Sequence, residues 1–137
     1  MSVKKTNPIL KAASYYLPVL LWAALIFFFS NQESLPSFET SFLDFLFKKS
    51  AHMFVYAVLY LLLFRAFAQE SAWQLSRKNF LLPFFLCFLY SVTDEIHQHF
   101  TPGRHPSPRD VGFDLLGASS VLLFQQGFFI PNKGISA

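Results

Sequence analysis

Four apolar runs, separated by polar stretches, divide this chain of 137 residues. The first three cover residues 15–29, 51–67 and 80–92, and the fourth extends from the pair Ser107-Pro108 to about Phe129. A helix needs about 20 mostly apolar residues to cross a bilayer, so the third run must continue to Phe100 to be long enough. The pattern predicts an all-α protein, a bundle of four transmembrane helices, with a basic segment at 1–14, a membrane domain at 15–130 and a short tail at 131–137.

Local chemistry indicates where these helices begin and end. The sequence TPG at 101–103 ends the third helix, because proline and glycine interrupt helical structure. Ser107 followed by Pro108 is typical of a helix start, with serine as the cap and proline in the first position. The polar connection at 31–47 contains the segment FLDFLF, which we interpret as a short amphipathic helix at the membrane interface.

Composition supports a membrane location. Hydrophobic residues make up 53% of the chain and charged residues only 14%, whereas soluble domains are about one quarter charged. The net charge of +3 does not indicate nucleic-acid binding, because the basic residues are spread over termini and loops. The first apolar run lacks a cleavage site, so we expect an uncleaved helix. A single cysteine, Cys87, excludes an intramolecular disulfide and a zinc ribbon.

The distribution of lysine and arginine predicts an orientation. Seven of them lie at the termini and in the middle loop, namely Lys4, Lys5, Lys11, Arg65, Arg77, Lys78 and Lys133. The other two loops hold four, namely Lys48, Lys49, Arg104 and Arg109. By the positive-inside rule both termini are cytoplasmic. Because the spans alternate in direction, the unusual polar residues then converge at the extracytoplasmic end of the bundle.

Two groups of polar residues are candidates for chemistry at that end. Lys48, His52 and Tyr56 are spaced by four, so one helix face presents cationic and hydroxyl groups that suit a phosphate, with His52 available for proton transfer. Asp94 and Glu95 are adjacent carboxylates beside apolar surface, which suits general acid or base work. The alternatives are a lysine that extends to the interface with ordinary interhelical hydrogen bonds, and a helix end whose charges reach water.

The loop between the third and fourth helices adds further candidates. Arg104 and Arg109 either grip a phosphate or neutralise the nearby acids. Asp110 fits helix capping, whereas Asp114, one turn deeper, would be explained by pairing with an arginine or a lysine across the bundle. Gly117 would allow another helix to approach closely. We expect no metal and no cofactor, because the two histidines of DEIHQH point to different sides of a helix and no phosphate-binding glycine loop or dinucleotide fingerprint is present.

Three segments resemble the VanZ-like family of small membrane proteins: LLWAALIFFFSNQ, KKSAHMFVYAVLYLLL and DEIHQHFTPGRHPSPRDVGFDLLGA, which together cover most of residues 17–120. The chain departs from the family pattern at Lys49-Ser50, where an acid is frequent, and at Asp114, where asparagine is frequent. The resemblance implies a four-helix, multi-pass protein of the bacterial cytoplasmic membrane, in a family named after a factor associated with teicoplanin resistance. It also implies a site made of His52, Tyr56, Asp94, Glu95, Gln98, Arg104 and Asp110.

Two functional hypotheses follow, and whether the protein is an enzyme stays open between them. In the first, His52, Asp94 and Glu95 are catalytic and act on a lipid phosphate or a lipid-linked envelope component. The ligand-binding residues are then Lys48, Tyr56, Gln98, Arg104, Arg109, Asp110 and Asp114. In the second, the same face binds a lipid headgroup or a glycopeptide antibiotic without catalysis and alters antibiotic access to the membrane. A transporter is disfavoured because the polar residues lie at one end only. The oligomeric state is left open.

Overall fold

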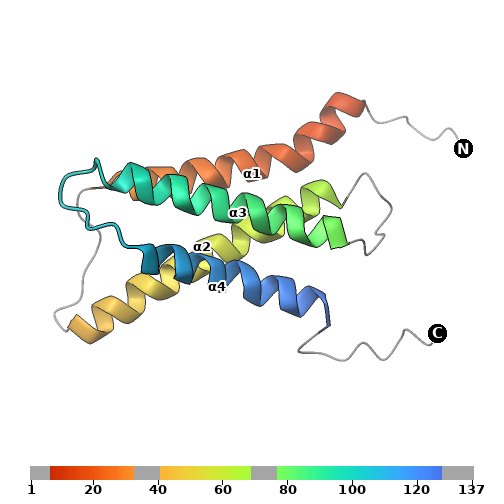
Figure 1. Cartoon of the computed structure of the whole chain (residues 1–137). Helices are drawn as coiled ribbons and strands as arrows, with labels where there is room; N and C mark the ends of the chain where they lie inside the picture. The colour runs from red at the N-terminus through yellow and green to blue at the C-terminus, as the bar shows by residue number, and fades with distance from the viewer. Residues whose placement is uncertain (1–6, 33–40, 69–76, 128–137) are drawn as a thin grey trace, which may run out of the picture.

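The computed structural model describes residues 7–32, 41–68 and 77–127. These ranges form α1 (Pro8–Ser30), α2 (Ser41–Phe67), α3 (Arg77–Gln98) and α4 (Pro108–Gln125), with no strand among them (Figure 1). The prediction of an all-α protein is confirmed. Three segments, Ile9–Ser30, Ser41–Phe67 and Phe80–Gln98, are long and apolar enough to cross a membrane, whereas α4 is shorter and more polar.

The helices alternate in direction along the bundle. Helices α1 and α3 end, and α2 and α4 begin, at the same end of the bundle, which we call the polar end (Figure 1). The other end, where α2 ends and α3 begins, we call the opposite end. This arrangement brings the polar termini of all four helices together, as the alternation of spans in the sequence predicts.

Helix boundaries follow local chemistry in two places. Ser107 caps α4, since its Oγ accepts a hydrogen bond from the backbone N–H of Arg109 at 3.3 Å and Pro108 takes the first position, as predicted. The chain reverses after α3 through a turn in which the N–H of Arg104 donates to the carbonyl of Thr101 at 3.3 Å. Gly103 in that turn has a φ of 77°, a conformation that favours glycine.

Helix α2 differs from its prediction. The FLDFLF segment is not a separate interfacial helix but the first turns of one continuous helix of 27 residues, which is about 40 Å long. No proline or glycine interrupts the range 41–67, and the ammonium group of Lys48 donates to Asp44 Oδ2 at 2.7 Å across this junction. The basic Arg65 therefore belongs to α2 rather than to the following loop, and α4 ends at Gln125 instead of about Phe129.

Helix α2 is the centre of the packing. Its buried side chains Tyr56, Leu59, Tyr60 and Phe64 form the core together with side chains of the other helices. Helix α4 lies closest, since a Cβ placed on Gly117 would be only 2.0 Å from the carbonyl oxygen of Met53. The predicted role of Gly117 in close helix approach is thus confirmed. Large apolar side chains, by contrast, are exposed along the outside of the bundle, as expected of helices that face lipid.

Candidate functional site

Four carboxylates are buried together at the polar end. Asp94 and Glu95 come from the last turns of α3, and Asp110 and Asp114 come from the first turns of α4. Each residue is at most 9% exposed. Buried charges are costly unless they are paired, so the partners of these four groups define what the site can do.

Asp114 connects three helices. Its Oδ1 accepts a hydrogen bond from His52 Nδ1 of α2 at 2.8 Å, and its Oδ2 accepts one from the Ser91 hydroxyl of α3 at 2.5 Å. A carboxylate that holds the Nδ1–H of an imidazole leaves Nε2 as the proton acceptor. The Asp114 side chain is 1% exposed and that of His52 is 19% exposed, so the histidine is the member of the pair that reaches the surface.

Asp110 pairs with Lys49. The ammonium group of Lys49 forms an ion pair with Asp110 Oδ1, and it also lies 5.6 Å from the ring centre of Phe113 and 5.7 Å from that of Phe45. The neighbouring Lys48 was predicted to bind the ligand because of its spacing from His52. The structure instead pairs Lys48 with Asp44 on the same helix, so Lys49 is the lysine that joins the four carboxylates.

Asp94 and Glu95 are only partly satisfied. Asp94 Oδ2 accepts from the amide of Gln98 at 3.0 Å, and Glu95 Oε2 accepts from the backbone N–H of Ser107 at 2.8 Å. Within the described ranges of the chain, the second oxygen of each, Asp94 Oδ1 and Glu95 Oε1, is buried without a hydrogen-bond partner, and so are the hydroxyls of Ser30 and Tyr56. The interior of the polar end therefore contains polar atoms that a ligand or solvent would satisfy.

Arg104 fastens the loop to the end of α1. Its Nη2 donates to the carbonyl of Phe29 at 3.1 Å and its Nε to that of Ser30 at 3.4 Å. Burial lowers the pKa of Arg104, while the carboxylates of Asp94, Glu95 and Asp110 act in the opposite direction, and the group stays charged. These two contacts add side-chain donors at the end of α1, where the carbonyl of Phe29 also accepts from the backbone N–H of Gln32 at 3.2 Å.

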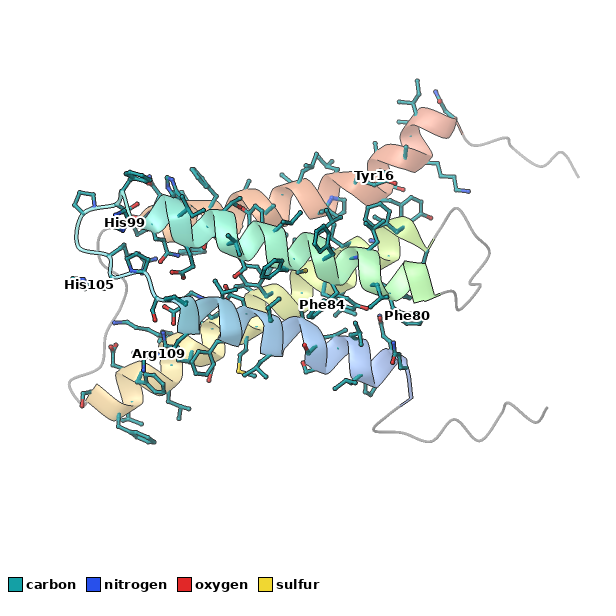
Figure 2. The ribbon with its side chains drawn as sticks, in the orientation of Figure 1. Tyr16, Phe80, Phe84, His99, His105 and Arg109 are labelled. Carbon is teal, nitrogen blue, oxygen red and sulfur yellow. The ribbon has the colours of Figure 1, made fainter. Side chains whose placement is uncertain are left out.

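The remaining candidates lie at the periphery. Arg109 is exposed at the start of α4, and His99 and His105 are exposed in and beside the loop that follows α3 (Figure 2). The ring of His97 makes a 3.2 Å contact with Asn31 Oδ1. Within the described residues, no group of three or more histidine, cysteine, aspartate or glutamate side chains has an arrangement that could hold a metal ion.

The structure thus brings most of the predicted site residues to one end, but it changes some partners. His52, Asp94, Glu95, Gln98, Asp110 and Asp114 lie in one electrostatically connected group, and Tyr56 lies buried beside it. The predicted site did not include Lys49, Ser30 or Ser91. Lys48, rather than Lys49, has the spacing of four from His52, and a serine in an apolar helix gives no sign of its partner.

Chemically, the group contains what proton transfer needs. An imidazole oriented by a buried carboxylate is a suitable general base, and nearby carboxyl groups without full hydrogen bonding are suitable acids. The exposed Arg109 and the charged Arg104 border this group and supply positive charge at its rim.

Comparison with known proteins identifies a family. The model of the VanZ/LLP1 family matches residues 15–126, which include all four carboxylates, His52 and Arg104. No curated protein and no solved structure matches the chain. Since the matched range covers most of the sequence and all of the described site, the chain belongs to the VanZ/LLP1 family.

Proposed function

We propose that the protein is a multi-pass protein of the bacterial cytoplasmic membrane whose polar end faces outward. There it binds and modifies a lipid phosphate or a lipid-linked component of the envelope. His52 acts as the general base, and Asp94 or Glu95 supplies a proton. The observation that carries this proposal is the His52–Asp114 contact of 2.8 Å inside a group of four buried carboxylates.

The location of this group within the bundle supports a lipid as ligand. Exposed apolar side chains surround α1, α2 and α3, so the ends of these helices would lie at the level of lipid headgroups. A headgroup of the surrounding lipid is already present at this level. Arg109, exposed at the start of α4, is the group that would hold the anion, and Arg104 would assist from the loop.

Four spans with both termini in the cytoplasm are part of the proposal. Helix α4 has 18 residues and is about 27 Å long, slightly less than the hydrocarbon core. Its first turn carries Arg109 and Asp110, which belong at the headgroup level, and its close packing on α2 would cover the buried Asp114.

The test compares lipids from cells that produce the wild type, His52→Gln or Asp114→Asn. We expect the abundance of one phosphorylated lipid to change with the wild type and to stay at the vector level with both variants. Lys48→Gln is the matched control, because its ammonium group is paired with Asp44, and it should behave as the wild type. If His52→Gln changed the abundance of that lipid as much as the wild type does, the role of His52 as general base would be overturned.

A second function is favoured by the engagement of Arg104. Because its guanidinium group already binds the carbonyls of α1, the polar end resembles a fixed recognition surface more than a mobile active site. In this alternative the protein binds a headgroup or a glycopeptide antibiotic without catalysis and alters antibiotic access. Native mass spectrometry would distinguish the two, since pure binding should survive His52→Gln and weaken with Arg104→Ala. Retention of the same lipid in Arg104→Ala would count against this function.

A further inference from the structure

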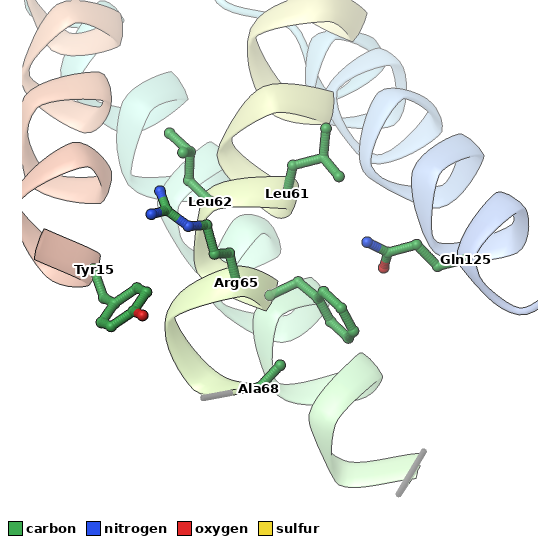
Figure 3. Close-up of a pocket in the computed structure, with 7 residues that line it drawn as sticks. Tyr15, Leu61, Leu62, Arg65, Ala68 and Gln125 are labelled. Carbon is green, nitrogen blue, oxygen red and sulfur yellow. The ribbon is translucent and has the colours of Figure 1, made fainter. Parts of the chain in front are cut away.

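A groove lies at the opposite end of the bundle, far from the four carboxylates. It has a volume of about 470 Å³, within the range of small-molecule sites. Tyr15 of α1 and Gln125 of α4 line it on two sides, and α2 contributes Leu61 and Leu62 between them (Figure 3). Phe64 of α2 also lines it. The groove exists because α2 separates α1 from α4, which make no backbone contact with each other within the described residues.

Among the described residues that line this apolar groove, one is charged, namely Arg65. Arg65 is exposed, and its guanidinium carbon lies 5.2 Å from the ring centre of Tyr15. The acids of the described part of the chain, Asp44, Asp94, Glu95, Asp110 and Asp114, all belong to the polar end. Arg65 therefore has no neutralising carboxylate among the described residues. Lys11 precedes Tyr15 by four residues on the same face of α1 and adds a second positive charge nearby.

One polar atom in the groove also needs a partner. Gln125 Oε1 is buried and has no hydrogen-bond donor among the residues that the structure describes. A ligand that fits would combine an anionic group for Arg65, a hydroxyl for the Gln125 amide and an apolar chain for Leu61 and Leu62. Tyrosine and arginine are typical of the level at which lipid headgroups meet the hydrocarbon core.

We infer that this groove is a binding site for an anionic phospholipid of the leaflet at the opposite end. The phosphate lies at Arg65, a hydroxyl of the headgroup reaches Gln125, and one acyl chain covers Leu61 and Leu62. Phosphatidylglycerol has all three features, whereas phosphatidylcholine lacks both the net charge and the hydroxyl. This site is separate from the proposed function at the polar end and does not depend on it.

The experiment is native mass spectrometry of the full chain after reconstitution with equal amounts of phosphatidylglycerol and phosphatidylcholine. The wild type should retain phosphatidylglycerol in preference. Arg65→Gln should lower this preference about fivefold, the usual effect of one basic residue at an anionic surface, and Arg65→Lys should keep most of it. Leu61→Trp should block the groove and remove the bound lipid.

The matched control for Leu61→Trp is Leu81→Trp, because Leu81 is also an exposed leucine but lies outside the groove, on α3. It should retain phosphatidylglycerol as the wild type does. Circular dichroism would verify that every variant is helical. Equal retention of both lipids by the wild type, or equal behaviour of the two tryptophan variants, would overturn the inference. So would a dimer that Leu61→Trp dissociates, since the groove would then be an interface between copies.

Discussion

At the residue scale, Asp114 is the most deeply buried of the four carboxylates. It is almost completely buried and accepts hydrogen bonds from both His52 and Ser91. In a buried ion pair or charge-assisted hydrogen bond, removal of one partner leaves the other without compensation. Loss of the contact with His52 should therefore destabilise the folded protein more than loss of an exposed ion pair would.

The His52–Asp114 pair and the Asp44–Lys48 pair allow a direct comparison. His52→Ala should lower the free energy of unfolding by about 3 kcal/mol, since it leaves a buried carboxylate with only Ser91. Lys48→Ala should cost less than about 0.5 kcal/mol, because the Lys48 side chain is 36% exposed and its pair is an ordinary i, i+4 contact. Titration with a denaturing detergent, followed by circular dichroism, measures both. Equal losses of unfolding free energy in His52→Ala and Lys48→Ala would contradict the idea that burial makes the His52–Asp114 pair the stronger one.

Sequence reasoning identified the chemical groups of the site better than their partners. It expected an arginine or a lysine as the partner of Asp114 across the bundle, whereas the structure gives His52 and Ser91. These contacts depend on how α2 and α3 are rotated about their axes. The same limitation explains why Lys48, rather than Lys49, was predicted to belong to the site. Neighbouring residues on a helix differ in direction by about 100°, and only the packing of α2 on α4 determines which of them meets Asp110.

At the scale of elements, the helix count and several boundaries were predictable because local chemistry determines them. Ser107 with Pro108 starts α4, and a turn with Pro102 and Gly103 follows α3, as the sequence indicated. The start of α2 was not predictable in this way. Its first turns are apolar on exposed positions, a pattern equally compatible with a separate interfacial helix and with a longer transmembrane one.

The two glycines of α4 give a prediction at this scale. Gly117→Ala should destabilise the protein by about 1–3 kcal/mol, because the new Cβ would overlap the backbone of Met53, which cannot move aside as a flexible side chain could. Gly112→Ala is the control, because a Cβ there has no atom within 4 Å among the described residues apart from the adjoining residues and backbone of α4 itself, and alanine favours helix by up to about 1 kcal/mol. Unfolding in detergent measures the stability of both variants. A Gly117→Ala variant as stable as the wild type would contradict the close approach of α2 and α4.

At the scale of the whole molecule, the alternating helices divide the chain into two chemically different ends. All described carboxylates belong to the polar end, whereas the opposite end presents Tyr15, Arg65 and an apolar groove. The sequence predicted this division from the order of the apolar runs alone. The sequence did not predict the groove, because the groove depends on the absence of contact between α1 and α4 among the described residues.

The proposed orientation predicts which positions are accessible from outside the cell. The native Cys87 is fully buried, so an added cysteine would be the reactive one. His99→Cys, exposed after α3, should react in intact cells with a maleimide that does not cross membranes. Gln126→Cys, exposed after α4, should react only after the membrane is opened. The reverse labelling pattern would show that the polar end faces the cytoplasm.

The length of α2 makes the thickness of the bilayer relevant to the polar end. A helix of about 40 Å is longer than a hydrocarbon core of about 30 Å, so we expect α2 to tilt in a bilayer, and Figure 1 shows it crossing behind α3 and α4. The close approach of Gly117 to Met53 leaves no room for a Cβ between α4 and α2 at that point. Because His52 directly precedes Met53, we expect a change in this tilt with bilayer thickness to displace His52 less than the two ends of α2.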